Sequence, residues 1–271
     1  MPGLATQVER YNVVIAIGGV PVRVNTTDPD FLDMLENRYA GFVSEEAHVE
    51  FDFEVDLTPP ASASRDADVN VKYRSGRWFM ERGDFRAEWE PATGKGWIRQ
   101  TANPYSIDAV LRIVHTLVLA RQGGFLLHSA SAIRNGKAFL FAGVSGAGKT
   151  TISRLAPADA TLLTDEISYV RKQDEDYFAF GTPFTGELAK LGENTSAPLA
   201  AVYLLAQGPE NKIEAVAAPD AGRALLTNML FFAEDQEMGH WAFQAACDFV
   251  HRVRVYRLTF VPDARVWEMI G

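Results

Sequence analysis

The residues of this sequence best suited to chemistry lie in one short run, GVSGAGKT, at positions 143–150. The run meets the pattern G-x-x-x-x-G-K-[ST], with Gly143, Gly148, Lys149 and Thr150 at the fixed positions. Glycines at this spacing let consecutive backbone amides point at a phosphate, while the lysine reaches the β- and γ-phosphates and the threonine offers its hydroxyl to Mg²⁺.

An apolar strand pattern precedes this run and a helical pattern follows it, which is the context that phosphate binding requires. A helix that starts at the loop adds its positive dipole end. We therefore expect ATP to bind here with Mg²⁺. The expected nucleotide-binding residues are Gly143, Ser145, Gly146, Ala147, Gly148, Lys149, Thr150 and Thr151.

An acidic pair follows soon after, in ATLLTDEIS at 160–168. An apolar strand ends there at Asp165, fifteen residues after Thr150, which leaves room for one short helix and a return strand. A carboxylate beside the phosphates can hold Mg²⁺ or accept the proton of an attacking hydroxyl. We predict that Asp165 is the general base and that Thr150, Asp165 and Glu166 hold the metal. The alternative is a solvated Asp-Glu pair at a strand end.

His128 lies in FLLHSASAI at 125–133, where it alternates with Leu126 and Ala130 on one face of a predicted strand. A lone histidine on a strand is often a core residue, yet this one precedes the phosphate loop by one hairpin. Both readings stay open, and His128 is kept as a catalytic candidate with Asp165, Lys149 and Glu166. The other four histidines, His48, His115, His240 and His251, are expected to be structural.

The run LHSASAIRNGKAFLFAGVSGAGKTT at 127–151, with LTDE at 163–166, resembles the HPr serine kinase/phosphorylase family. It is also similar to smaller relatives found with ribosomal peptide-modification systems, some of which phosphorylate a precursor peptide. The resemblance covers about residues 125–270 and implies a P-loop domain of the kind shared with ATP-dependent phosphoenolpyruvate carboxykinase. The family pattern places a histidine at 128, the P-loop at 143–150 and the acidic pair at 165–166.

This sequence departs from the family pattern at two places. The second member of the acidic pair is Glu166 rather than Asp, and GTPFTGE at 181–187 stands where HPr kinases carry Glu-x-Arg-Gly. These differences argue against HPr as the substrate and against the phosphorylase half-reaction. Glu187, in the replacing loop, is a further candidate carboxylate.

The first hundred residues predict an antiparallel β-rich domain, residues 1–105. A hairpin turns at Gly18-Gly19, a helix begins after Asp28, and alternating segments at 49–57, 69–75, 77–82 and 85–90 predict strands with one buried face. A flexible loop is expected at 58–68. This domain carries no catalytic motif, and we expect it to recognise the substrate.

Residues 106–271 are predicted to form an α/β P-loop kinase domain. We expect a helix capped by Ser106, then a hairpin of strands 125–133 and 137–142, and strands at 160–164, 200–206 and 253–260. Helices are expected at about 220–232, 236–251 and 263–270.

The composition sets broad limits on function. The net charge of −9 argues against nucleic-acid binding, which needs clustered Lys and Arg. No apolar run is long enough to cross a membrane, and a single cysteine excludes an intrachain disulfide. We expect a cytoplasmic enzyme, monomer or oligomer, that transfers the γ-phosphoryl group of ATP to a Ser/Thr hydroxyl of a peptide or small protein. Two alternatives stay open, a small-molecule hydroxyl kinase and a non-catalytic nucleotide-binding module.

Overall fold

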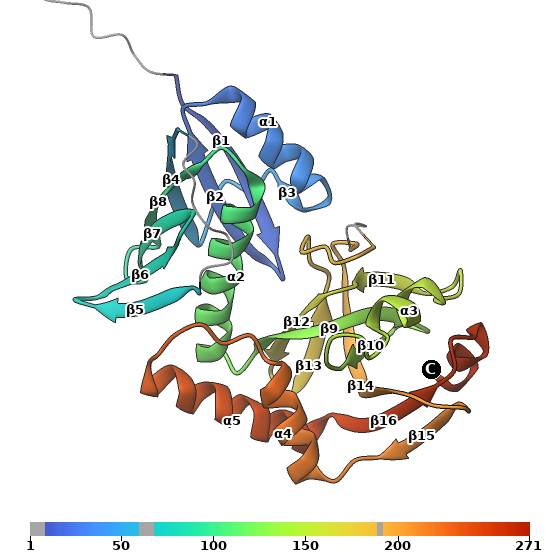
Figure 1. The fold of residues 1–271 in the computed structure, drawn as a ribbon. Coiled ribbons are helices and arrows are strands. Elements are labelled where there is room, and N and C mark those ends of the chain that lie inside the picture. The colour runs from blue at the N-terminus through green and yellow to red at the C-terminus, as the bar shows by residue number, and fades with distance from the viewer. Residues whose placement is uncertain (1–8, 60–67, 189–191) are drawn as a thin grey trace, which may run out of the picture. The chain divides into compact units, whose positions relative to one another are not determined.

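The computed structural model describes residues 9–59, 68–188 and 192–271. The chain has a mixed α/β fold with two multi-stranded sheets and divides into two compact units (Figure 1). Unit 1 comprises the residues up to Val110, and unit 2 begins at Leu111. Most of the loop predicted at 58–68 is formed by residues 60–67, which lie outside the described residues.

Unit 1 is built on an eight-stranded sheet with the strand order β3-β1-β2-β4-β8-β7-β6-β5. One α-helix, α1 (Pro29–Arg38), and a short 3-10 helix, η1 (Ala40–Phe42), follow the first hairpin. The strands are β1 (Tyr11–Ile17), β2 (Val20–Thr26), β3 (Val43–Ser44), β4 (Phe51–Thr58), β5 (Asn70–Arg74), β6 (Arg77–Arg82), β7 (Phe85–Glu90) and β8 (Lys95–Thr101).

The local signals at the start of unit 1 are confirmed. β1 and β2 pair as an antiparallel hairpin in which Ile17 faces Val20 across the glycine turn. The Asp28 side chain caps α1 by accepting a hydrogen bond from the Phe31 amide at 2.9 Å. Phe31 and Leu35 form the buried face of the helix.

The mostly antiparallel pairing that the sequence predicts is found for every pair of this sheet except those of β4. This strand runs parallel to β2 on one side and to β8 on the other. Parallel neighbours need a crossover connection, and α1 and η1 with β3 supply it between β2 and β4. The alternation of residues 49–57 identifies the buried face of the strand but carries no information on the direction of its neighbours.

The helix that joins the two units, α2 (Pro104–Arg121), begins earlier than predicted. Its cap is Asn103, whose Oδ1 accepts hydrogen bonds from the amides of Tyr105 at 3.0 Å and Ser106 at 3.1 Å. Ser106 is instead fully buried inside the first turn, where its hydroxyl donates to Asp84 at 2.8 Å. Asn-Pro at 103–104 is itself a good start signal, because proline suits the first helical position.

Unit 2 is built on a second sheet, with the order β10-β9-β12-β13-β14-β16-β15 and with β11 paired to β9. Its strands are β9 (Phe125–Arg134), β10 (Lys137–Ala142), β11 (Thr161–Thr164), β12 (Ile167–Gln173), β13 (Asp176–Phe180), β14 (Ser196–Gln207), β15 (Lys212–Ala215) and β16 (Arg254–Phe260). Its helices are α3 (Lys149–Arg154), α4 (Ala218–Asn228), α5 (Gln236–Arg252) and the 3-10 helix η2 (Ala264–Met269).

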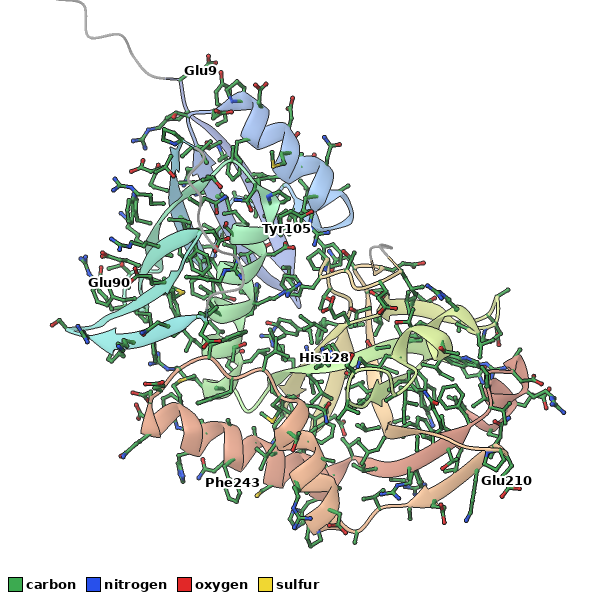
Figure 2. The ribbon with its side chains drawn as sticks, viewed as in Figure 1. Glu9, Glu90, Tyr105, His128, Glu210 and Phe243 are labelled. Carbon is green, nitrogen blue, oxygen red and sulfur yellow. The ribbon has the colours of Figure 1, made fainter. Side chains whose placement is uncertain are left out.

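The pairing of β10 with β14 brings distant residues to one edge of this sheet. The two strands are parallel, so the loop after Ala142 and the residue Gln207 at the end of β14 leave the sheet on the same side. β9 is antiparallel to β10, and its early residue His128 therefore lies toward that same side (Figure 2). The topology thus assembles one edge from three separate segments.

Unit 2 has two buried apolar clusters. Leu140, Val202 and Phe249 belong to a buried cluster beneath α4 and α5, while Phe141, Ile152 and Trp267 belong to another near α3 and η2. The predicted helices at 220–232 and 236–251 and the strand at 253–260 are confirmed with small shifts in their ends, whereas the segment predicted as a helix at 263–270 is the 3-10 helix η2. Among the described residues, none of the helices has the length and apolar character of a membrane span.

Candidate functional site

The glycine loop at 143–148 connects the last residue of β10 to the first residue of α3. Gly146 and Gly148 have φ angles of 79° and 111°, in the left-handed region that favours glycine. A Cβ atom on Gly148 would also lie 2.7 Å from Cζ of Phe260, so a larger residue there would clash as well as strain the backbone. Both glycines are therefore required by the loop conformation.

The short helix α3 is held in place by residues near position 267. The indole Nε1 of Trp267 donates to the carbonyl of Ile152 at 3.0 Å. Arg134 on β9 donates in turn to the carbonyls of Trp267 and Ile270. Because α3 has only six residues, its dipole is a weak source of phosphate affinity, and the loop amides and Lys149 matter more.

Lys149 folds back over the loop that precedes it. Its Nζ donates to the carbonyl oxygens of Gly143 at 2.7 Å and Val144 at 3.3 Å. Burial lowers the pKa of Lys149 below its ordinary value, while the nearby carboxylates of Glu166 and Glu187 act in the opposite direction. The ammonium group is thus partly desolvated, which strengthens its interaction with an incoming anion, whereas the two nearby carboxylates oppose the approach of an anion that carries no metal ion.

Asp165 is the most buried of the acidic residues, with 3% of its surface exposed. Its Oδ1 accepts a hydrogen bond from the amide of Gly186 at 2.9 Å, and its Oδ2 accepts one from the amide of Leu188 at 2.9 Å. Asp165 therefore ties the 185–188 loop to the end of β11. This anchoring function is additional to the base and metal roles that the sequence predicts for it.

The two other carboxylates of the pocket are those of Glu166 and Glu187. Glu187 is exposed, and its Oε2 accepts a hydrogen bond from the Thr150 hydroxyl at 3.2 Å. Glu166 is half-buried and close enough to Lys149 to affect the pKa of that lysine. The 185–188 loop thus brings Glu187, which the sequence left as a candidate, against the predicted metal ligand Thr150.

His128 is half-buried at the edge of the sheet (Figure 2). Burial, followed by the positive charges of Lys149 and Arg112, lowers the pKa of its imidazole below the ordinary value of 6.5. The ring is therefore neutral at physiological pH. A neutral imidazole beside a phosphate site can donate one hydrogen bond and accept another.

These groups surround one open pocket of about 600 Å³. Gly143 and Ala147 are the two expected nucleotide-binding residues that do not line it; Ala147 packs into the apolar interior instead. Thr185, Gly186 and Gln207 also line the pocket but were not predicted from the sequence. Thr185 and Gly186 belong to the loop at 181–187, and Gln207 is the last residue of β14. The lining residues are His128, Ser145, Gly146, Gly148, Lys149, Thr150, Thr151, Asp165, Glu166, Thr185, Gly186, Glu187 and Gln207.

The donor set of this pocket fits Mg²⁺ bound together with a nucleotide. Among the described residues, no three His, Cys, Asp or Glu side chains are arranged to hold a metal by themselves. Mg²⁺ usually takes one or two carboxylates and completes its shell with phosphate oxygens and water. The three carboxylates and the Thr150 hydroxyl of this pocket can supply such oxygen ligands. The carboxylates would repel a triphosphate without a metal ion, so the pocket suits a nucleotide that binds together with Mg²⁺.

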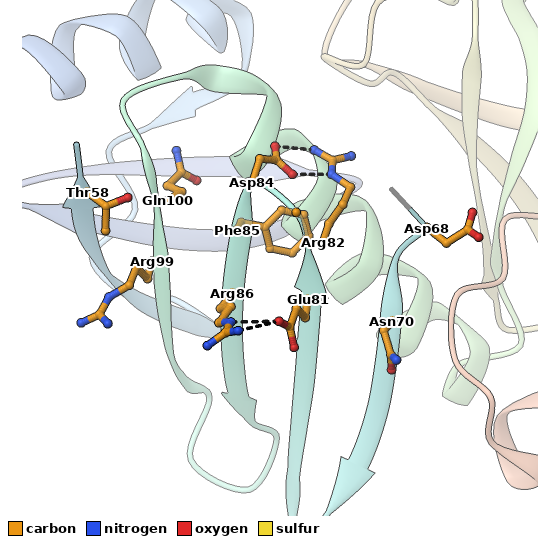
Figure 3. Close-up of a pocket in the computed structure, with 11 residues that line it drawn as sticks. Thr58, Asp68, Asn70, Glu81, Arg82, Asp84, Phe85, Arg86, Arg99 and Gln100 are labelled. Carbon is orange, nitrogen blue, oxygen red and sulfur yellow. Dashed lines mark hydrogen bonds and ion pairs between the residues drawn. The ribbon is translucent and has the colours of Figure 1, made fainter. Parts of the chain in front are cut away.

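A second open pocket, of about 490 Å³, lies in unit 1 on the strands β5 to β8 (Figure 3). Its arginines are largely paired with its own acids: Arg82 binds Asp84 through two hydrogen bonds, and Arg86 binds Glu81. It contains neither a glycine loop nor a lysine among its lining residues. Of these two pockets, the one at the glycine loop is therefore the better candidate for chemistry on phosphates.

Comparisons with known proteins were made with the sequence and with the structure. A solved structure, the HPr(Ser) kinase/phosphatase from Coxiella burnetii, matches with 8% sequence identity, over 50% of this chain and 84% of that chain. Its TM-score of 0.26 is too low to bear on the fold or the activity. No curated protein matches. The model of one family, described as SynChlorMet cassette protein ScmC, matches residues 99–271. Because that match spans more than half of the chain, the chain belongs to the ScmC family.

Proposed function

We propose that this protein is an ATP-dependent phosphotransferase that acts on a hydroxyl group. The observation that carries the proposal is the single pocket in which the glycine loop, Lys149 and Thr150 meet Asp165, Glu166 and Glu187. A phosphate-binding loop facing several carboxylates is the arrangement that phosphoryl transfer to a hydroxyl needs. A binding module without catalysis would need the loop and one or two carboxylates for Mg²⁺, whereas this pocket has three carboxylates.

Each residue of the pocket has a distinct role in this proposal. The amides of the glycine loop bind the phosphates of the nucleotide. Lys149 releases the carbonyls of Gly143 and Val144 and neutralises charge on the β- and γ-phosphates. Asp165 accepts the proton of the attacking hydroxyl, and its bonds to the 185–188 loop hold it in a fixed orientation.

Thr150 and Glu166 would hold Mg²⁺, with Glu187 beside Thr150 as a further oxygen donor. The metal, when bound, supplies positive charge that stabilises the phosphate oxygens. The neutral imidazole of His128 on β9 would orient the γ-phosphoryl group by donating a hydrogen bond to it.

We further propose that the acceptor is a Ser or Thr residue of a peptide or small protein. All the phosphate-binding groups lie in unit 2, and unit 1 offers the edge strand β5, to which an extended chain could add. The family description names a cassette, which supports a search for the acceptor among the other proteins of that cassette.

The proposal is tested by incubating the full chain with ATP and Mg²⁺ against Ser/Thr peptides and a panel of hydroxyl-bearing metabolites, following ADP release and mass gain. The control variant is Lys149→Ala. We expect it to abolish transfer and to weaken nucleotide binding less, because the backbone amides remain.

Phosphopeptide formation that Lys149→Ala removes supports the proposal. Efficient phosphorylation of a metabolite, with no peptide modified, would replace the acceptor class by a small molecule. Nucleotide binding without ADP release for any acceptor would leave a binding module, and normal turnover by Lys149→Ala would show that the loop is not the phosphate site.

A further inference from the structure

Arg112 is a second cation near the pocket, which it adjoins through Phe184 and does not itself line. It lies in the part of α2 that belongs to unit 2, and its guanidinium stacks over the ring of Phe184, with 4.9 Å between Cζ and the ring centroid. Phe184 is 1% exposed and directly precedes Thr185, Gly186 and Glu187, which line the pocket. The ring therefore fixes the guanidinium plane next to the wall of the site.

The guanidinium of Arg112 lacks the partners that a buried arginine normally has. Its Nε is fully shielded from solvent and, in the described part of the chain, has no hydrogen-bond acceptor. No ion pair of Arg112 is found among these residues either, whereas the half-buried Arg82 binds the buried Asp84 through Nε and a terminal nitrogen. A shielded donor without an acceptor carries a free-energy cost that a bound anion would offset.

The positive charge of Arg112 acts on His128, which lines the pocket. Besides burial, the positive charges of Lys149 and Arg112 lower the pKa of that imidazole. His128 therefore experiences the field of two cations, Lys149 from the glycine loop and Arg112 from α2.

We propose that Arg112 binds an oxyanion of the substrates next to His128, which makes it a specificity-determining residue of the reaction. This inference rests on the proposed function. A planar guanidinium held on an aromatic ring is well suited to bind a phosphoryl or carboxylate group through two parallel hydrogen bonds. The oxyanion comes either from the γ-phosphoryl group of the nucleotide or from a carboxylate of the acceptor beside its hydroxyl.

The test uses Arg112→Gln in the full chain, with Arg121→Gln as the matched control. Arg121 lies on the same helix and places its guanidinium over Trp241, at 5.3 Å, but Trp241 is not next to any residue that lines the pocket, whereas Phe184 directly precedes Thr185. Arg112→Lys is the second variant, because it keeps the charge and removes the planar fork. Thermal unfolding of all the variants is recorded, so that a folding defect is recognised separately from a binding defect.

The first arm measures binding of Mg-ADP, Mg-ATP and the non-hydrolysable analogue Mg-AMP-PNP by calorimetry. If the oxyanion is the γ-phosphoryl group, Arg112→Gln weakens ATP and the analogue roughly 10- to 100-fold, the scale of one hydrogen bond to a charged group, and leaves ADP unchanged. The second arm compares two serine peptides that differ only by Asp or Asn next to the serine. If the oxyanion is the acceptor's, Arg112→Gln raises KM for the Asp peptide alone.

The proposal is overturned if Arg112→Gln behaves as Arg121→Gln does in both arms, or if Arg112→Gln alters only the unfolding temperature. It is supported if either arm shows its selective loss and Arg112→Lys recovers only part of it. A wild-type chain that binds no nucleotide at all would refute the proposed function and this inference with it. If the wild type binds ATP and ADP but Arg112→Gln behaves as Arg121→Gln does, this inference alone is refuted.

Discussion

Replacing Asp165 by Asn tests two functions of this residue. The structure shows that it anchors the 185–188 loop, and the sequence predicts that it is the general base. Asp165 accepts one amide hydrogen bond on each carboxylate oxygen, from Gly186 and from Leu188, both at 2.9 Å, and is 3% exposed. Asparagine offers one acceptor oxygen and one NH₂ group. The NH₂ group must therefore face a backbone N–H, and one of the two bonds to the 185–188 loop is lost.

The size of the effect follows from those two contacts. A hydrogen bond to a charged group contributes about 1.5–3 kcal/mol, and a buried N–H left without an acceptor adds to the cost. We expect Asp165→Asn to lower the free energy of unfolding of unit 2 by about 2–4 kcal/mol, which corresponds to a decrease in Tm of roughly 4–16 °C for a domain of this size. If Asp165 is also the general base, phosphoryl transfer falls by about 10²- to 10⁴-fold while ATP binding is largely kept.

The two effects are measured separately, by scanning calorimetry without ligand and by ADP release below the unfolding temperature. Glu187→Gln is the matched control, because it removes a negative charge from the same pocket at an exposed position. We expect its unfolding to stay within about 0.5 kcal/mol of the wild type. An unfolding temperature for Asp165→Asn equal to that of Glu187→Gln would refute the anchoring argument, and near-normal turnover would refute the base.

Substitutions of His128 and His115, two of the histidines of unit 2, test a catalytic and a structural role. His128→Ala should reduce turnover less than Asp165→Asn if the imidazole only orients a phosphate; an equal loss of stability with unchanged kinetics would instead identify a core histidine. Burial lowers the pKa of His115 from 6.5 to about 3. As the pH falls below 6.5, the unfolded state therefore binds a proton that the folded state does not, and the free energy of unfolding decreases. The wild type should therefore lose up to about 2 kcal/mol between pH 6.5 and 5 through this group. His115→Phe should abolish that part of the pH dependence in urea unfolding, and an unchanged pH dependence would show that His115 is not its source.

The sequence predicted those parts of the fold that depend on neighbouring residues. The Gly18-Gly19 hairpin, the Asp28 cap and the strand–loop–helix order around Lys149 all follow from local patterns, and the structure has them. The strands β3, β8, β12, β13 and β15 were not predicted, although Ile167–Gln173 is rich in residues that favour strands. The cap of α2 was misplaced because Ser106 also suits a cap, and only the tertiary bond to Asp84 shows that it is buried.

The candidate site was predicted only where one motif carried it. The glycine loop and the acidic pair could be read from the sequence because each has a fixed spacing. Gln207 could not, since its place in the pocket depends on the pairing of β14 with β10, and its Nε2 then donates to the carbonyl of Gly146 at 2.8 Å. Arg112 was missed for the same reason: a helical arginine gives no sign of the aromatic ring on which it stacks.

The contact between α3 and the residues near position 267 also determines when the nucleotide site can exist during protein synthesis. Ile152 and Trp267 are separated by 115 positions in the sequence, and Arg134 and Trp267 by 133. The ribosome therefore completes the glycine loop long before it releases the tryptophan that holds the following helix. A six-residue helix does not persist alone in water. We expect the nascent chain to bind no nucleotide until the residues beyond 260 have emerged, because only then can Trp267 hold the helix that follows the glycine loop.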